Sequence, residues 1–440
     1  MKYAHLFSAL ALASLPALAY AQTDNALVST AEHEGLVAHS EMPCIDAPSF
    51  TATDEEFGGS TLSNNETFMK GKAADGRRLE DWTKKSKPSV NFGGYIIGKY
   101  AWDKREAEAA TQDGFNLRLV RLYVSGEVFR DFKYRIQLEV NGTPHIKDAT
   151  LEWVHWKEFS IKAGQFKRAF SFENPYNPFD VGVGDYSQLV KKLAGFDDRI
   201  NGTTKYEKST NGGRDLGLQF QGDLFPSRRD GHTFLHYQLA FYNGQGINTW
   251  DVDKKKDIIG TLQFNPVKNF TIGIFGWKGT AAVKEKVQMA EGMGGSKTAI
   301  RTTDRNRMAV GVKYESDWTF RAEYARSWGH KLDDYAWNGT KNKYELTAAA
   351  AANGKEADAF YATLGIPCAA WLKAYVKYDL YRDYANSKRM NSIYSAALNF
   401  KFTKNLYFQA QYNLVDTKDD VVPSNEDRYS QLWAEMYVRF

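Results

Sequence analysis

Charged side chains recur at every second position in several segments of this 440-residue chain. In the segment FKYRIQLEV, for example, Lys133 and Arg135 alternate with apolar residues. An extended strand points alternate side chains to opposite faces, so such a segment has one charged face and one apolar face. Fixed charges that line a water-filled path act on passing ions through their field. The spacing therefore favours ion attraction over bond-making chemistry.

Eight of the basic residues with this parity are candidates for the lining of a pore. They are Arg121, Lys133, Arg135, Lys162, Lys313, Arg321, Lys373 and Lys377. Acidic residues such as Glu139 and Glu152 have the same parity and nearly balance the basic ones. The alternative interpretation is that the charges pair across neighbouring strands and only stiffen a wet wall.

No pattern typical of an enzyme or of a metal site accompanies these charges. The eight histidines are scattered, without an HExxH motif or paired-ligand spacing. We also find no serine and histidine pair that would suit a lipase built on a barrel. We therefore expect no catalysis, no metal and no cofactor.

The alternating segments predict the fold. Besides FKYRIQLEV they include LYFQAQYNL and WLKAYVKYDLY. About sixteen are expected, each with the roughly 9–11 residues that a tilted strand needs to cross a bilayer. They begin near residues 91, 115, 132, 147, 159, 213, 232, 257, 270, 306, 318, 356, 370, 392, 405 and 430. Short and long gaps alternate between them, which predicts an all-β, transmembrane antiparallel β-barrel with short periplasmic turns and long external loops.

The end of the chain favours a closed barrel. The segment SQLWAEMYVRF alternates up to Phe440, and no polar tail follows. In lipid every backbone polar group needs a partner within the protein, so a sheet cannot keep a free edge. We therefore expect the last strand to pair with the first, near GGYIIGKYA, and its apolar parity to face acyl chains.

The first 88 residues differ from the rest. Residues 1–21 have a basic start, an apolar run and an Ala-Tyr-Ala cleavage site, which predicts a signal peptide and export. Residues 22–88 are polar and are expected to be a periplasmic or lumen-lying segment before a barrel domain at 89–440. The net charge of +4 is too mild to indicate a nucleic-acid partner. A disulfide between Cys44 and Cys368 stays open.

The longest gap, roughly residues 169–212, exceeds the length of a simple connector. The lumen of a barrel of this size could hold it, so we expect the loop to fold inward and narrow the pore. Outward folding as a surface cap is the alternative. The candidate constriction residues are Glu173, Asp180, Asp185, Lys191, Lys192 and Arg199.

Several stretches resemble the phosphate-selective porins of the O and P type, over roughly residues 90–440. They are RLVRLYVSGE at 118–127, KDATLEW at 147–153, GQFKRAFSFE at 164–173, RDLGLQFQG at 214–222 and FYNGQG at 241–246. The resemblance implies a sixteen-stranded homotrimer with a constricting third loop and basic lumen residues. On that basis Arg121, Arg135, Lys162 and Arg168 become the leading pore-lining candidates.

Together these features predict a porin of the bacterial outer membrane that lets small polar or anionic solutes, phosphate among them, diffuse passively through a water-filled channel. Its expected partners are outer-membrane lipid, these solutes and further copies of the chain. Two alternatives stay open: a structural or adhesive barrel with a plugged lumen, and an uptake channel for oligosaccharides. The second is suggested by inward aromatic residues, namely Tyr123, Tyr375, Tyr381, Tyr407 and Trp433.

Overall fold

The fold is given by a computed structural model. It describes residues 88–104, 113–129, 131–196, 199–200, 204–205, 211–288, 295–352, 355–385, 387, 389–419 and 428–440. The expected signal peptide at 1–21, nearly all of the segment 22–88, and Cys44 lie outside these residues. Cys368 is exposed.

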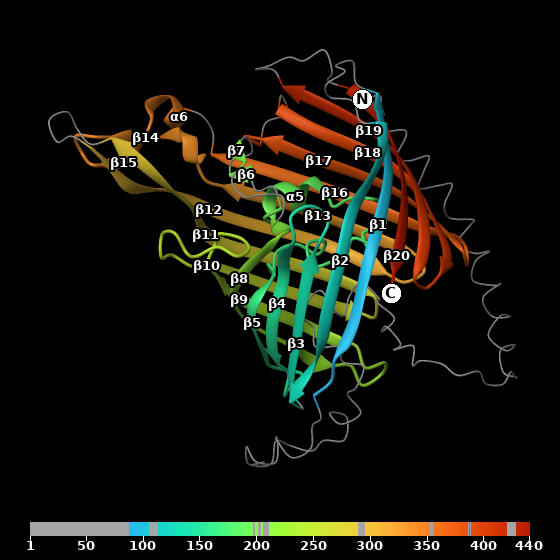
Figure 1. The fold of residues 1–440 in the computed structure, drawn as a ribbon. Coiled ribbons are helices and arrows are strands. Elements are labelled where there is room, and N and C mark those ends of the chain that lie inside the picture. The colour runs from blue at the N-terminus through green and yellow to red at the C-terminus, as the bar shows by residue number, and fades with distance from the viewer. Residues whose placement is uncertain are drawn as a thin grey trace, which may run out of the picture. The chain divides into compact units, whose positions relative to one another are not determined.

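Sixteen antiparallel strands form a closed barrel, as the alternation predicts (Figure 1). In order around the barrel they are β1 (Asn91–Lys104), β2 (Asp113–Phe129), β3 (Phe132–Glu139), β4 (His145–Trp153), β5 (Ser160–Lys167), β8 (Arg214–Pro226), β9 (Thr233–Tyr242), β10 (Asp257–Val267), β11 (Phe270–Gln288), β12 (Ser296–Glu315), β13 (Thr319–Trp328), β16 (Glu356–Ala369), β17 (Leu372–Asp383), β18 (Arg389–Thr403), β19 (Leu406–Asp419) and β20 (Arg428–Arg439).

The remaining elements are short and lie between the barrel strands. They are the helices α5 (Gln188–Leu193) and α6 (Ala348–Ala352), the 3-10 turn η4 (Leu332–Asp334), and the paired strands β6 (Arg199–Ile200) with β7 (Thr204–Lys205) and β14 (Tyr335–Asn338) with β15 (Lys343–Leu346). In the described part of the chain, no helix has the length and the apolar character that crossing a membrane requires.

The barrel closes between its first and last strands. β1 pairs with β20 in antiparallel register, with Ile97 opposite Tyr437. Beyond this ladder, the amide nitrogen of Gly94 donates to the carbonyl oxygen of Phe440 at 3.0 Å, and the amide nitrogen of Phe440 donates back to Gly94 at 3.0 Å. The expectation that the final aromatic residue completes the closure is confirmed.

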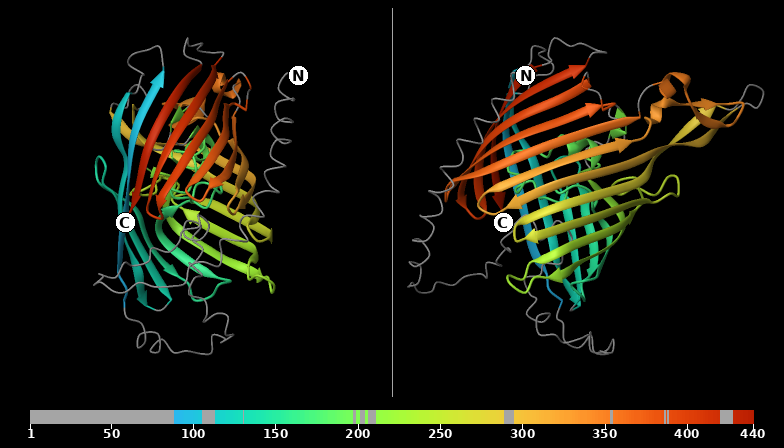
Figure 2. Two further views of the ribbon diagram at one scale, coloured as in Figure 1. Left: turned by 90° about the vertical axis from the view of Figure 1, so that its right-hand side faces the viewer. Right: turned by 180° about the vertical axis from the view of Figure 1, so that it is seen from behind.

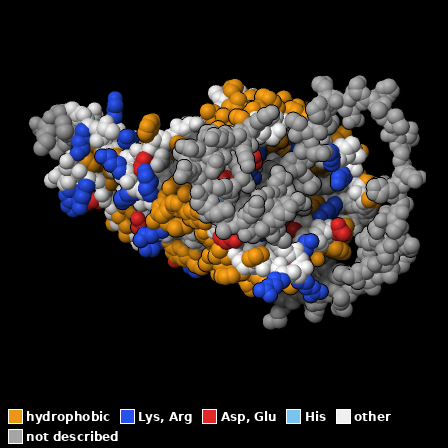
Figure 3. All heavy atoms as spheres, turned by 90° about the horizontal axis from the view of Figure 1, so that it is seen from below, with side chains coloured by type: hydrophobic (Ala, Val, Ile, Leu, Met, Phe, Trp, Pro, Cys, Tyr) orange, Lys and Arg blue, Asp and Glu red, His pale blue; other side chains and the backbone are white. Residues whose placement is uncertain are grey.

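The two faces of the strands differ as the alternation predicts. On β18 the side chains of Tyr394 and Leu398 are exposed on the outside, whereas Ala397 between them points inward and is buried. Other strands show the same exposed apolar parity, as at Ile272 and Ile274 of β11. Seen from below, hydrophobic side chains gather in patches on the outer wall (Figure 3). This is the surface that a bilayer would cover.

All but one of the predicted strand starts lie within three residues of the observed ones, and the exception is β12. The predicted start near residue 306 is wrong, because β12 begins at Ser296. Thr280 to Gln288 pair with Ser296 to Asp304 as a two-stranded ribbon that extends beyond the barrel (Figure 2). Polar residues occupy both faces of this ribbon, so it lacks the apolar periodicity that marks a spanning strand.

Candidate functional site

The segment between β5 and β8 lies against the inner wall of the barrel. The hydroxyl of Tyr407 on β19 donates to the carbonyl oxygen of Phe179 at 2.5 Å. The Gln409 amide, on the same strand, donates to the carbonyl oxygen of Gly182 at 2.8 Å. We name residues 168–196 the lumen loop. Its contacts extend along the wall from β10 to β20, as a hydrogen bond to Thr261 and the packing of Phe179 on Tyr437 illustrate, and single side chains of β1, β2 and β5 also reach the loop.

Small residues on the inward parity make room for the lumen loop. The ring of Phe172 lies against Gly273 and Gly311, and a Cβ added at Gly273 would overlap that ring. Alanines at the inward positions of neighbouring strands, such as Ala309 and Ala325, are fully buried in the same apolar cluster. The loop therefore packs in a dry hydrophobic core inside the barrel, which burial of apolar area stabilises.

Ion pairs and charge-assisted hydrogen bonds fix the same loop. Lys377 lies 3.3 Å from the Glu173 carboxylate, and both side chains are almost completely buried. The second carboxylate oxygen of Glu173 accepts from the amide nitrogen of Ser187 at 2.7 Å. Arg321 donates to the carbonyl oxygens of Asp180 and Val181 at 3.0 and 3.1 Å. Charged donors and acceptors make the stronger hydrogen bonds, so these contacts hold the loop in one position.

Four of the predicted pore-lining residues are therefore placed differently from the expectation. Arg321 and Lys377 hold the loop, and Lys313 is buried with a contact of 3.7 Å to Glu315. Arg168 is fully buried at the base of the loop, where Nη2 donates to Asp215 at 2.6 Å. Parity assigned three of them to the wall correctly, but the loop covers them and keeps water away.

The other predicted basic residues lie where water can reach them or border that region. Lys133, Arg135 and Lys162 are half-buried on the inward faces of β3 and β5. Lys162 approaches Glu152 to 3.9 Å, and the Arg135 guanidinium lies 4.4 Å from the centre of the Tyr123 ring. Arg121 is buried and donates to Glu139 at 2.8 Å and to the Tyr95 hydroxyl at 2.7 Å. The Lys373 ammonium, on the opposite wall, donates to Thr319 at 2.8 Å.

Few side chains of the lumen loop remain accessible. Between residues 168 and 196 the side chains that are not buried are Asp180, Asp185, Lys191, Lys192 and Phe196. Glu173, predicted as a constriction residue, is buried, and the Arg199 side chain lies outside the described residues. The accessible surface of the loop thus carries two carboxylates and two ammonium groups, and its charges balance.

The two accessible aspartates differ in their proton affinity. Burial raises the pKa of Asp180 to about 6, although Arg439 and Arg321 act in the opposite direction. Burial would also raise the pKa of Asp185, but Lys191 and Arg118 overcome this effect and hold that pKa well below its usual range. Of these two aspartates, Asp180 is the one that is close to changing its charge near pH 6.

Arg118 was not predicted as a lumen residue. Its parity points to the lipid side, but the pairing of β1 with β2 shifts register between Ile97 and Gly98, which are opposite Leu119 and Leu117. Arg118 is the extra residue of this β-bulge, and a bulge re-aims a side chain. Its guanidinium reaches the loop and the wall, at 3.4 Å from Asp185 and 2.8 Å from Glu435. The only sequence signal was its place in the motif RLVRLYVSGE.

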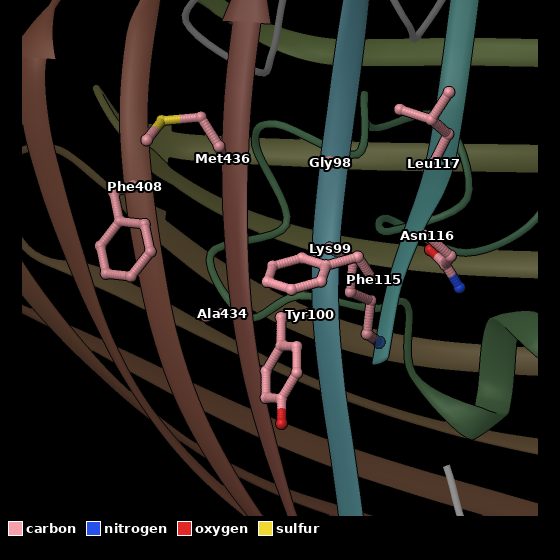
Figure 4. A pocket seen from close by; sticks show the side chains of 9 residues that line it. All are labelled: Gly98, Lys99, Tyr100, Phe115, Asn116, Leu117, Phe408, Ala434 and Met436. Carbon is pink, nitrogen blue, oxygen red and sulfur yellow. The ribbon is translucent and has the colours of Figure 1, made fainter. Parts of the chain in front are cut away.

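A hollow on the outside of the barrel is separate from these groups. Figure 4 shows it beside Gly98, bordered by Phe115, Leu117 and Met436. These three side chains are exposed and apolar, and they share the lipid-facing parity. Within the described part of the chain there is also no cluster of three or more His, Cys, Asp or Glu side chains that could hold a metal ion.

Comparison with known proteins agrees with this architecture. The family model described as phosphate-selective porin O and P matches residues 92–257, which confirms the resemblance read from the sequence. No curated protein matches the chain.

Three solved structures have a similar fold at low sequence identity. An anion-selective porin from Comamonas acidovorans superposes with a TM-score of 0.56 at 12% identity, covering 80% of this chain and 100% of that one. The trimer form of OmpT from Vibrio cholerae gives 0.50 at 10% identity, with coverage of 81% and 100%. The outer membrane channel DcaP of Acinetobacter baumannii gives 0.50 at 14% identity, with coverage of 81% and 98%. All three likenesses concern the barrel fold.

Proposed function

We propose that the protein is an outer-membrane porin that gives small polar solutes a water-filled path and prefers anions. The observation that carries this proposal is the one-sided position of the lumen loop. The loop packs against the wall from β10 to β20 and meets the opposite wall through Arg118 of β2 and Lys167 of β5. Solutes would pass beside these contacts, along the wall formed by β2 to β5. The match to the porin family model begins in β1 and includes this wall.

The charges on that wall support the preference for anions. The half-buried charged side chains on the inward faces of β2 to β5 comprise five basic and two acidic residues: Arg118, Lys133, Arg135, Lys162, Lys167, Glu127 and Glu152. The accessible charges of the loop cancel, so the wall decides the sign of the field. A low-dielectric surround focuses such a field and raises the local concentration of the opposite ion.

Outer-membrane lipid and further copies of the same chain are the proposed partners of the barrel. The exposed apolar parity suits acyl chains. A homotrimer is proposed from the family resemblance, and the OmpT structure of similar fold is described as a trimer form. The proposed activity is passive diffusion and requires no catalytic group.

Two of the five aromatic residues that suggested the oligosaccharide alternative, Tyr407 and Tyr381, are covered. Tyr407 stacks on Tyr437 at 4.4 Å between ring centres, and Phe179 of the lumen loop packs on both rings. The ring of Tyr381 is buried, with the Lys192 ammonium 4.2 Å from its centre. Rings covered in this way cannot stack on a passing sugar.

Planar-bilayer recording of the purified protein tests the proposal. We expect stepwise conductance, and a reversal potential displaced toward the anion equilibrium potential under a gradient of potassium chloride. Replacing chloride by phosphate shows whether phosphate also passes. A protein that inserts but stays silent would favour the plugged structural barrel, and cation preference would contradict the charge argument.

A further inference from the structure

Five charged residues meet where the lumen loop approaches the junction of β1, β2 and β20. They are Lys99, Arg118, Asp185, Lys191 and Glu435, and we call them the junction cluster. Three of them are basic and two are acidic. Asp185 and Lys191 come from the loop, and the other three come from the barrel wall.

The two sides of the junction cluster differ in accessibility. On the wall side, Arg118 Nη1 donates to Glu435 at 2.8 Å, and only 1% of the Glu435 side chain is exposed. On the loop side, Arg118 Nη2 lies 3.4 Å from Asp185, whose side chain is 31% exposed. Lys191 forms an ion pair with the other carboxylate oxygen of Asp185 and is itself 36% exposed. Glu435 thus holds Nη1 of Arg118 in place. Nη2 of the same guanidinium faces the Asp185 carboxylate, which water can reach.

We propose that Arg118 and Lys191 form a binding site for the carboxylate group of a small organic acid, and that Asp185 occupies this site when no solute is bound. The inference rests on the proposed function, because the solute must reach the lumen. It adds a solute class and a mechanism. The carboxylate of a passing acid displaces the Asp185 carboxylate from Arg118 and Lys191, and Asp185 returns to these two cations when the acid leaves.

The geometry around Asp185 explains the choice of carboxylate. One oxygen of Asp185 faces the Arg118 guanidinium and the other faces the Lys191 ammonium, so the two cations are spaced for a planar group with two oxygens. The Asp185 side chain is 31% exposed, so the carboxylate of a solute can reach the same two cations and compete with the tethered carboxylate. Neither cation moves with the departing Asp185, because Glu435 fixes Arg118 and Lys191 belongs to helix α5.

Succinate serves as the probe in single-channel recording at constant chloride concentration and ionic strength. We expect succinate to reduce the chloride current of the unmodified protein. Asp185→Asn removes the competing carboxylate and should lower the half-blocking concentration about fivefold, the size expected for an exposed ion pair. Arg118→Gln and Lys191→Gln should raise it. Lys192→Gln is the matched control, because Lys192 is the next residue on α5 but lies over Tyr381.

Each result bears on the proposal. An unchanged or higher half-blocking concentration in Asp185→Asn, or an equal effect of Lys191→Gln and Lys192→Gln, would overturn it. If phosphate blocks Asp185→Asn at a lower concentration than succinate does, the assignment to carboxylates is wrong. The chloride conductance of every variant without succinate shows whether the loop has kept its position.

Calorimetric titration of the detergent-solubilised protein with succinate separates the site from the channel. Binding in the same order of variants by a protein that does not conduct would reject the porin function and keep the site. Conduction with no succinate binding would reject the site and keep the porin function.

Discussion

Arg118 and Glu435 are separated by 317 residues in the chain, yet Arg118 Nη1 lies 2.8 Å from Glu435 Oε2 inside the barrel. Arg118 belongs to β2 and Glu435 to β20, and β1 lies between these strands. The pair therefore connects the second strand to the last one across the first. It can form only after the barrel has closed.

Replacement of Glu435 by Gln should lower the stability of the closed barrel. The change keeps the shape of the side chain but removes the charge that compensates Arg118 and Lys99, which lies 3.6 Å away. Loss of one partner of a buried ion pair costs about 3–5 kcal/mol. The temperature at which the folded form disappears on a semi-native gel measures the effect. Glu345→Gln, on the exposed hairpin β14–β15, is the control, and an equal change in both variants would contradict the prediction.

Charge reversal on the wall should change ion selectivity. Arg135→Glu combined with Lys162→Glu moves the balance on β2 to β5 from basic to acidic, so the reversal potential should shift toward cations. The control reverses two exposed lysines outside the lumen, Lys254→Glu with Lys255→Glu. If the control shifts the reversal potential as much as the wall variant does, the selectivity does not arise on this wall.

Enlarging Gly273 should displace the lumen loop. In Gly273→Val the new side chain would overlap the Phe172 ring, so the loop must move from the wall and the single-channel conductance should change. Gly276→Val is the matched control, because Gly276 is on the same strand with nothing within 4 Å of its added Cβ. Adding Phe172→Ala to Gly273→Val should restore much of the original conductance. A conductance of Gly273→Val equal to that of Gly276→Val would count against the loop packing.

The sequence predicts the barrel well because the bilayer imposes one rule on every spanning strand. An apolar outer parity and complete backbone pairing are required along the whole circumference, so segments such as FKYRIQLEV are recognisable one by one. The same rule does not apply beyond the membrane. For that reason the part of β12 that begins at Ser296 has no apolar alternation from which it could be predicted.

The lumen is less predictable because parity reports only which way a side chain points. Lys162 and Lys377 both point inward, but one is half-buried and the other is enclosed by the lumen loop. A bulge also shifts the parity, and so Arg118 was overlooked. Small inward residues on adjacent strands, such as Gly273, Gly311 and Ala325, indicate where the lumen loop packs. A wall that faces water does not require small side chains, whereas a wall covered by a loop does.

Acidification should make the channel more selective for anions through Asp180. Its pKa is raised to about 6 by burial, so the carboxylate is mostly charged at pH 7.5 and mostly neutral at pH 5. Loss of this negative charge leaves the lumen more positive, and the reversal potential should move toward anions as the pH falls through 6. The sign for stability agrees. A raised pKa means that the folded state favours the neutral form of Asp180, so the folded state gains stability as the pH falls toward the pKa of the unfolded chain.

Asp180→Asn should remove this shift in reversal potential. Asp185→Asn should keep it, because Lys191 and Arg118 hold the pKa of Asp185 low enough for that group to stay charged at both pH values. A shift of the same size in Asp180→Asn as in the unmodified protein would assign the titration to another group.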